Sequence, residues 1–228
     1  MAKIELPVLP AHLYRYRSFR RENSLSQEIA AINSAYLYCS PFLSMNDPME
    51  CVYSPSMASG RGSYYKRAIE RLYRQKGSFL FACFSETPNN ELMWAHYAAN
   101  YSGICIEYDA PKLVRCLDSG VSVVRLAYGD TPPAVDMDKP LNVTQTAKEI
   151  LSHKKSSWAY EREWRVLGRT SPMQYQRKKC VTSVYFGSRI EPENREAIMK
   201  ELKGGGFEFF DMEVEGYDHS FTRTKPKR

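Results

Sequence analysis

The spacing of apolar and polar residues divides the chain into short elements of both kinds. Strands are expected where side chains alternate in polarity or form short apolar runs, and helices where apolar residues recur every three or four positions. The predicted strands are residues 13–17, 36–39, 79–84, 104–108, 121–128, 161–167, 181–186 and 207–213. Residues 207–213 are predicted to be the final strand of the chain. The predicted helices are residues 25–32, 64–74, 90–99, 145–158 and 193–202.

The order of these elements favours an α+β fold. Residues 40–50 and 129–141 are rich in proline, aspartate and asparagine and are predicted to be loops. Strands and helices follow one another without a strict βαβ rhythm, and no G-x-G-x-x-G opens a helix. The prediction is a single α+β domain over residues 1–221, with a mixed or antiparallel sheet and flanking helices. Residues 222–228 are predicted to be a basic, frayed tail.

The net charge of +6 changes this picture only a little. The chain holds 32 lysine and arginine residues against 26 aspartate and glutamate residues, and four of the basic residues lie in the tail. The remaining 28 basic and 26 acidic residues leave the body near +2. A body so balanced does not require a phosphate-rich partner, although a local basic patch can still bind one.

The sequence also indicates the compartment and the state of the cysteines. No apolar run approaches the roughly 18–20 residues of a membrane span, and the first seven residues lack the apolar stretch of a signal peptide. We therefore expect a cytoplasmic protein without a membrane partner. The six cysteines are scattered without a C-x-x-C pair, which favours reduced core thiols and no metal site.

Two early motifs combine polar, aromatic and turn residues. Leu13-Tyr14-Arg15-Tyr16-Arg17 places arginine between tyrosines, which suits a fork for phosphate or carboxylate; an edge strand with solvated arginines is the alternative. Asn46-Asp47-Pro48 is a stiff turn that can aim Asn46, Asp47 or Glu50 into a cleft. A turn that merely locks the loop is the other interpretation, and it is favoured for Asp47.

The third motif centres on a histidine in a predicted helix. Ser85 follows a buried strand, and Asn89 or Asn90 can cap the helix that carries Trp94, His96 and Tyr97. Between these aromatic residues, His96 is a candidate proton carrier or hydrogen-bond donor to a ligand. A core histidine with satisfied hydrogen bonds is the alternative.

The fourth motif is Trp158-Ala159-Tyr160-Glu161-Arg162-Glu163-Trp164-Arg165. If the chain is extended from Glu161, then Glu161, Glu163 and Arg165 point to one face and the aromatic residues to the other. Two carboxylates beside an arginine can tune one another's pKa. A solvated strand face with a local ion pair is the alternative, and such a pair contributes little to stability.

These motifs resemble a bacterial family, the domain-of-unknown-function 2971 family. The resemblance covers most of the chain, with the motifs in the same order. The activity of the family is poorly defined, so the resemblance implies a family and no mechanism. It is carried by Tyr14 to Arg17, Tyr36 through Glu50, Cys83 to Ser85, Met93 to Tyr97, Gly103 to Tyr108, Trp158 to Arg165 and Val184 to Gly187.

A second likeness is to ADP-ribosyltransferases, whose sites use an early arginine, a serine on a strand and a late glutamate. Arg15, Ser85 and Glu161-Arg162-Glu163 occur here in that order, although no Ser-Thr-Ser follows Ser85. The likeness implies NAD as substrate, Glu163 as the catalytic carboxylate and Glu161 as an orienting group. The side chains expected to contact the cofactor are Arg15, Tyr16, Asn46, Ser85, Trp94, Tyr97 and Arg165.

Other functions stay open. One is a nuclease in which His96 acts as general acid or base with acidic partners. Another is a non-catalytic module that senses a nucleotide or binds a protein. In each case the expected ligand is a nucleotide-like small molecule, with nucleic acid or protein as a possible acceptor. A role as a toxin or phage-defence effector is suggested by analogy with other small bacterial domains.

Overall fold

The computed structural model describes residues 8–21, 23–56, 63–175 and 180–224. Contacts between Cα atoms divide the chain into two compact units. Unit 1 comprises residues 1–37, 84–118 and 174–228, and unit 2 comprises residues 38–83 and 119–173. None of the helices in the described ranges is both long and apolar enough to span a membrane.

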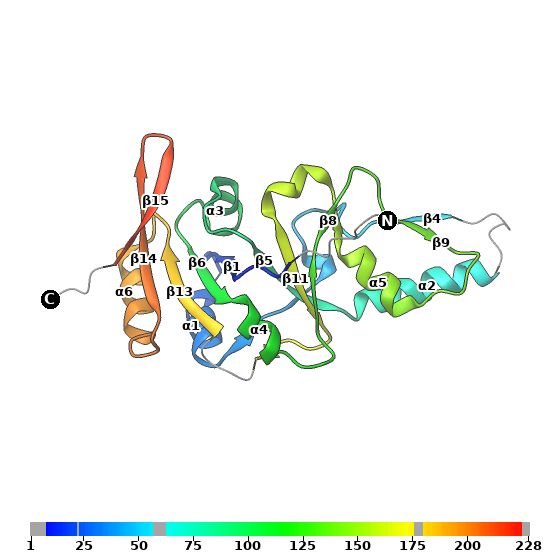
Figure 1. The fold of residues 1–228 in the computed structure, drawn as a ribbon, viewed down its shortest axis with the longest axis horizontal. Helices are drawn as coiled ribbons and strands as arrows, with labels where there is room; N and C mark the ends of the chain where they lie inside the picture. Colours follow the sequence, from blue (N-terminus) through cyan, green and yellow to red (C-terminus); the bar gives the residue numbers. More distant parts are fainter. Residues whose placement is uncertain (1–7, 22, 57–62, 176–179, 225–228) are drawn as a thin grey trace. The chain divides into compact units, whose positions relative to one another are not determined.

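Unit 1 is built on a mixed sheet in the order β15-β14-β13-β6-β1 (Figure 1). β13 and β14 are parallel, and the other neighbouring pairs are antiparallel. The central pairing sets Tyr14 opposite Glu107 and Tyr16 opposite Cys105, and Tyr14 also pairs with Ser85. The strands are β1 (His12–Arg17), β6 (Ile104–Asp109), β13 (Val181–Phe186), β14 (Glu208–Glu215) and β15 (Asp218–Arg223), with the short β2 (Tyr36–Leu37) outside this order.

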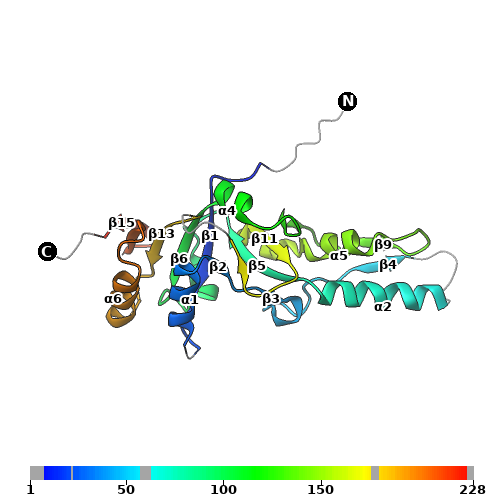
Figure 2. The ribbon, with the colours of Figure 1, turned by 90° about the horizontal axis from the view of Figure 1, so that it is seen from below.

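Helices flank this sheet. α1 (Ser24–Asn33) and α6 (Pro192–Glu201) lie on the same side of it (Figure 2). α3 (Glu91–Tyr97) packs on β1 through Trp94 and Tyr16, whose rings meet edge to face at 5.3 Å. α1 instead contacts the neighbouring Arg17 through Glu28, so α1 and α3 cover opposite faces, since side chains alternate along a strand. α4 (Ala110–Cys116) follows β6 directly and is capped by Asp109.

Unit 2 contains two helices and several short strands. α2 (Ser63–Gly77) and α5 (Val143–Leu151) lie side by side (Figures 1 and 2). β11 (Glu163–Gly168) pairs antiparallel with β7 (Ser122–Arg125) and neighbours β5 (Leu80–Ser85), whose last residues belong to unit 1. The other elements are β3 (Ser40–Pro41), η1 (Phe42–Ser44), β4 (Ser54–Ser56), β8 (Ala127–Tyr128), β9 (Ala134–Asp136), β10 (His153–Lys154), η2 (Ser156–Glu161) and β12 (Met173–Gln174), which ends in unit 1.

An apolar core holds α2 and α5 against the strands of unit 2. Leu72 from α2, Leu151 from α5, and Phe81 and Leu167 from β5 and β11 are all fully buried in it. Burial of apolar side chains of this size stabilises by about 1.5–3 kcal/mol each. The core therefore fixes the end of α5, whose Leu151 carbonyl accepts a hydrogen bond from Arg165, and the strand β11, which carries Glu163 and Arg165.

The α+β class, with a mixed sheet and flanking helices, is confirmed. The strands near residues 13–17, 79–84, 104–108 and 181–186 are present, as are the helices near residues 25–32, 64–74 and 193–202. Asn90 caps α3, since its side chain accepts a hydrogen bond from Met93 N. The single domain over residues 1–221 stays a prediction.

Residues 145–158 are not one helix. α5 ends at Leu151, the two residues of β10 follow, and residues 156–161 form the 3-10 helix η2. The chain leaves the helix because Lys154 pairs with Tyr128 in a parallel two-stranded ladder. Glu161 therefore lies in η2, and only Glu163 and Arg165 share a strand face.

The C-terminal prediction is also corrected. β14 is not the final strand, because the chain turns at Gly216, with φ +62°, and returns as β15. Thr222 and Arg223 of the predicted tail belong to β15, opposite Asp211 and Phe210; residues 225–228 lie outside the described residues. The predicted loops at 40–50 and 129–141 contain β3, η1 and β9, and α4, β4 and β12 were not predicted.

Candidate active site

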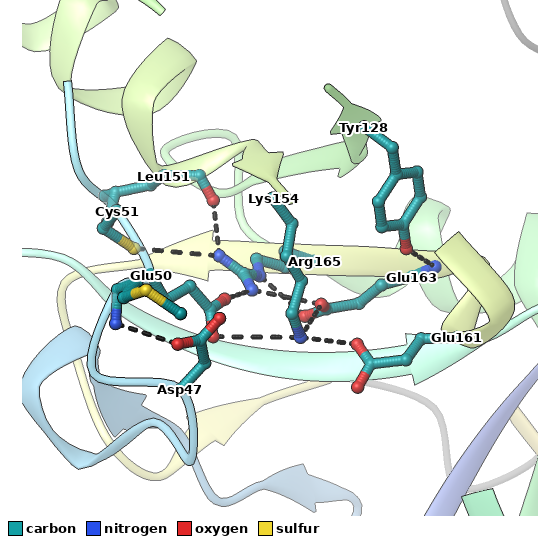
Figure 3. Close-up of polar contacts among 10 residues, drawn as sticks. Asp47, Glu50, Cys51, Tyr128, Leu151, Lys154, Glu161, Glu163 and Arg165 are labelled. Atoms are coloured by element: carbon teal, nitrogen blue, oxygen red, sulfur yellow. Dashed lines mark hydrogen bonds and ion pairs between the residues drawn. The ribbon is translucent and has the colours of Figure 1, made fainter. Parts of the chain in front are cut away.

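Five charged side chains of unit 2 meet in one buried group, here called the charged cluster. It consists of Glu50, Lys154, Glu161, Glu163 and Arg165 (Figure 3). Each of these side chains is at most 5% exposed. Removal of charges from water is costly, so a group of this size requires close pairing.

A sharp turn brings the two neighbouring glutamates to the cluster. Arg162 has a positive φ of 45°, which a side chain other than glycine seldom adopts, and it separates η2 from β11. Tyr128 fixes the start of β11 by accepting a hydrogen bond from Glu163 N at 2.8 Å. Glu161 and Glu163 consequently approach the same lysine, although they belong to different elements.

Lys154 lies among three carboxylates. Its Nζ is 2.5 Å from Glu161 Oε2, 3.3 Å from Glu163 Oε2 and 3.8 Å from Glu50 Oε2. The ammonium also lies 4.9 Å from the centre of the Trp158 ring, close enough for a cation–π contact. A single cation thus links all three acids.

Arg165 is the second cation and is completely buried. Its Nε and Nη2 donate to Glu163 at 2.7 and 3.1 Å, which is the two-pronged arrangement that guanidinium favours. Nη2 also pairs with Glu50, and Nη1 donates to the carbonyl of Leu151 at 2.7 Å. The guanidinium stacks 4.7 Å from the centre of the Phe81 ring, so its position is fixed from every side.

A strained loop presents Glu50. Asp47 accepts a hydrogen bond from Met49 N through its side chain and one from Glu50 N through its carbonyl, which closes a tight turn. The next residue, Cys51, has φ 60°, and its carbonyl accepts from the buried Lys76 at 2.7 Å. Strained residues persist where the surroundings hold them and often border functional sites. Here Cys51 and Arg162 both border carboxylates of the cluster.

The charges in the cluster do not balance. Three carboxylates face two cations, so full ionisation would leave one negative charge uncompensated in a buried place. Burial raises the pKa of Glu163 to about 7, although Lys154 opposes the rise. Burial also lowers the pKa of Arg165 to about 9. The cluster can therefore hold and release a proton near neutral pH.

A pocket of about 290 Å³ reaches the cluster. Its walls come from residues 49–52, 129–132 and 153–155, and Glu50 and Lys154 belong to its lining. His153 lies in the same wall, where a Cβ on Gly129 would come within 3.1 Å of its Nε2. Glycine at 129 therefore lets the backbone pass close to the histidine. The pocket connects the ion-paired acids with a space that a small group can enter.

Residues 93–166 match the model of the family described as protein of unknown function (DUF2971). This segment is similar to the DUF2971 family. The match confirms the family resemblance over those residues. No curated protein and no solved structure matches the chain, and the comparisons give no support to the likeness with ADP-ribosyltransferases.

The DUF2971 segment includes four members of the charged cluster. Lys154, Glu161, Glu163 and Arg165 lie within it, and Glu50 lies outside it. Of the residues proposed from the sequence, Glu161, Glu163 and Arg165 are thus brought together. Asn46 is also in unit 2, and it is exposed.

The other proposed residues lie in unit 1. Arg15 is buried, with its guanidinium 6.0 Å from the Phe84 ring centre. Tyr16 donates to Thr87 O at 2.9 Å, and the fully buried Trp94 donates to Pro88 O at 2.7 Å. Ser85 is also fully buried and accepts from Thr87 N at 3.4 Å. These four side chains make internal contacts in the core of unit 1.

The helical pair His96 and Tyr97 lies at the surface end of α3. His96 is exposed, and its ring is 6.2 Å from the half-buried ring of Tyr97. In the described ranges, no group of three or more histidine, cysteine, aspartate and glutamate side chains is placed to hold a metal ion. The roles proposed for His96 and Tyr97 stay predictions.

Glu107 in β6 forms a second polar group that the motifs did not reveal. Its carboxylate accepts hydrogen bonds from Thr182 Oγ1 at 2.5 Å, Ser183 Oγ at 3.0 Å and Tyr185 OH at 2.8 Å. Burial pushes the pKa of Glu107 up, but the hydroxyl donors, Tyr14 among them, outweigh burial and hold it below its ordinary value. The sequence contains one signal of this polar group, a glutamate inside the apolar run Ile104-Cys105-Ile106-Glu107-Tyr108.

Replacement of Tyr185 by phenylalanine is expected to lower the free energy of unfolding by about 2 kcal/mol at pH 7, because a hydrogen bond to a charged group is lost. Since the pKa of Glu107 is depressed, its contribution is present above the ordinary pKa near 4 and is lost as pH falls through the lower folded value. The deficit should therefore shrink as the pH falls below the ordinary glutamate pKa. Urea unfolding at several pH values measures it, with Tyr217→Phe at an exposed tyrosine of the same unit as control.

Glu50 and Lys154 complete the charged cluster, and sequence reasoning only half identified them. Glu50 was one of three candidates in its turn, and Lys154 was placed inside a helix. A lysine that precedes Trp158 and two glutamates was a usable signal, because buried carboxylates need a cation nearby.

Proposed function

We propose that the chain is an enzyme that cleaves or transfers a ribosyl group, with NAD as the first substrate to test. The observation that supports this most directly is the imbalance of three buried carboxylates against two cations beside a pocket. Enzymes that break glycosidic bonds use a pair of carboxyl groups, one of which holds a raised pKa, and pass through an oxocarbenium-like transition state.

Glu50 is the carboxylate that would face the substrate, because it lines the pocket. Positive charge develops on the ribosyl carbon as its bond to nicotinamide breaks and the electron pair moves to the ring nitrogen. A fixed carboxylate beside the ribosyl carbon stabilises that charge. Arg165 holds Glu50 in place, so the carboxylate does not reorganise during the reaction.

Glu163 and Lys154 would handle the proton. A new bond forms between the ribosyl carbon and the oxygen of water or of an acceptor, and that oxygen loses a proton. Glu163 can take the proton, because a base with a pKa near 7 is efficient at neutral pH. Lys154 lies at the pocket and 3.3 Å from Glu163, so it provides the path between them.

The size of the pocket limits what can enter. About 290 Å³ is at the lower end of the range for ligand pockets, which suits one ring and its sugar rather than a whole dinucleotide. The remainder of NAD would therefore lie outside this pocket. The hydroxyl groups of the ribose are hydrogen-bond donors, as a carboxylate at the pocket floor requires.

The expected result is nicotinamide release from NAD by the full chain, assayed with and without RNA, DNA and cell lysate. Glu50→Gln should reduce the rate about a thousandfold, because a fixed group that stabilises developing charge contributes about 3–4 kcal/mol. Glu163→Gln should reduce it about a hundredfold or more through loss of the base. Both variants keep the shape of the side chain.

Glu149→Gln is the matched control. Glu149 is an exposed acid on α5 of the same unit, so its replacement should leave the rate unchanged. No release of nicotinamide under any of these conditions, from well-folded protein, would contradict the choice of NAD. Release that survives in both Glu50→Gln and Glu163→Gln would contradict the site.

A further inference from the structure

The positive charge of the chain is concentrated in unit 2. Residues 38–83 and 119–173 hold 14 lysine and arginine residues against 9 aspartate and glutamate residues, a net charge of +5 out of the +6 of the whole chain. α2 alone holds five basic residues and one acidic residue, a net charge of +4. The charged cluster holds three acids and two basic residues, so the positive excess of unit 2 lies outside it.

The arginines of α2 form a stripe. Arg67, Arg71 and Arg74 are exposed and recur at spacings of four and three residues, which places them on one face of the helix. The stripe extends roughly 10 Å along the helix axis. A row of this kind matches a linear polyanion better than a single phosphate.

Two hollows border the stripe. The first has a volume of about 600 Å³ and lies between Arg71 and Arg74 of α2 and residues 141–144 at the start of α5. A hydrogen bond of 3.1 Å from Gln75 to Thr144 joins the two helices there. The second hollow, of about 450 Å³, is mainly apolar and is lined by Tyr53, Ile69, Glu70, Tyr73 and Arg74.

Arg74 lines both hollows, so the basic and the aromatic surface are continuous. Tyr73 is 55% exposed, and its ring meets the Phe42 ring edge to face at 6.3 Å, a contact that restrains its orientation. Arginines that track a backbone beside an open aromatic ring are the combination that binds unpaired bases. A duplex keeps its bases stacked and would not use the ring.

We propose that α2 and the start of α5 form a binding surface for single-stranded nucleic acid. Phosphate groups contact Arg71 and Arg74, and a base stacks on Tyr73. The two hollows share no lining residue with the pocket beside the charged cluster, so this binding is separate from the chemistry proposed there. The surface gives the enzyme a nucleic-acid partner, whether as acceptor or as anchor.

The test is fluorescence anisotropy of the full chain with a labelled 20-nucleotide oligouridine, over a series of salt concentrations. Arg71→Gln/Arg74→Gln should weaken binding at least tenfold and flatten the slope of log affinity against log salt by about 1.4, because each phosphate contact on a single strand contributes about 0.7. Lys200→Gln/Lys203→Gln removes the same charge from exposed positions of unit 1 and should change neither value.

Variants of Tyr73 distinguish the contribution of base stacking to binding from the contribution of charge. Tyr73→Ala should weaken binding about tenfold with the salt slope unchanged, and Tyr73→Phe, which keeps the ring, should bind as the wild type does. Equal losses in the arginine pair and the lysine pair would overturn the proposal. So would equal affinity for a duplex of the same length, or binding to anionic lipid vesicles but not to the oligonucleotide.

Discussion

Replacement of Arg165 by methionine is expected to lower the free energy of unfolding by about 3–5 kcal/mol at pH 7. Removal of one partner from a buried ion pair leaves the other charge without compensation, and this costs far more than the pair itself contributes. Arg165 is fully buried and contacts Glu50, Glu163 and the Leu151 carbonyl, so three acceptors each lose a donor and Lys154 alone remains to pair the carboxylates. Urea unfolding followed by circular dichroism measures the loss.

The matched change is Arg125→Met on β7, the strand that pairs with β11. Arg125 is exposed, so this variant should lose less than about 1 kcal/mol. The double variant Glu163→Gln/Arg165→Met should lose less free energy of unfolding than the two single variants together. With glutamine at position 163, no charge remains there that Arg165 must compensate. A loss below about 1 kcal/mol for Arg165→Met would mean that water reaches the cluster.

The second large effect is a dependence of stability on pH that Glu163 causes. Burial raises the pKa of this carboxyl to about 7, whereas in the unfolded chain it is about 4.3. Between these values the folded state binds more protons than the unfolded state, so the free energy of unfolding falls as pH rises. Over this range the contribution of Glu163 falls by about 3 kcal/mol, and it is constant above about pH 8.

Glu163→Gln removes this titration and keeps the shape of the side chain. The difference in stability between the wild type and this variant should therefore change by about 3 kcal/mol in favour of the variant from pH 4.5 to pH 8. Urea unfolding at half-unit pH steps measures the difference. The free energy of unfolding of Glu149→Gln should depend on pH in the same way as that of the wild type. Parallel curves for Glu163→Gln would show that Glu163 ionises normally.

Local patterns predicted much of the fold because they follow from backbone geometry. Asn89 or Asn90 was expected as a helix cap, and the side-chain oxygen of Asn90 does accept a hydrogen bond from Met93 N. Glu163 and Arg165 were expected on one face of a strand, because residues two apart share a face. Such predictions need only neighbours along the chain, and they hold where the element is regular.

The charged cluster could be predicted only in part, because its members come from segments far apart in the sequence. Lys154 was predicted to lie in a helix, but it lies in β10, where it pairs with Tyr128, 26 residues earlier in the sequence. Glu161 reached the same lysine from a 3-10 helix through a positive φ at Arg162, which no pattern of hydrophobic residues encodes. Glu50 comes from more than 100 residues earlier. Tertiary packing decided each of these positions.

The hairpin of β14 and β15 was missed for a similar reason. Asp218 to Arg223 alternates only weakly in polarity, and no strand was predicted there. Its partner β14 supplies the hydrogen bonds, and Gly216 supplies the turn with a positive φ. A strand at the edge of a sheet is defined by its neighbour more than by its own pattern.

The central claim is that the charged cluster keeps a titratable proton close to neutral pH. Nuclear magnetic resonance of the glutamate side-chain carboxyl carbons, recorded from pH 4 to pH 9, tests it most directly. The prediction is one glutamate that titrates near pH 7 in the wild type and disappears from the spectrum in Glu163→Gln. If every glutamate carboxyl of the folded protein titrates below pH 5, the cluster holds no such proton and the proposed acid–base site is wrong.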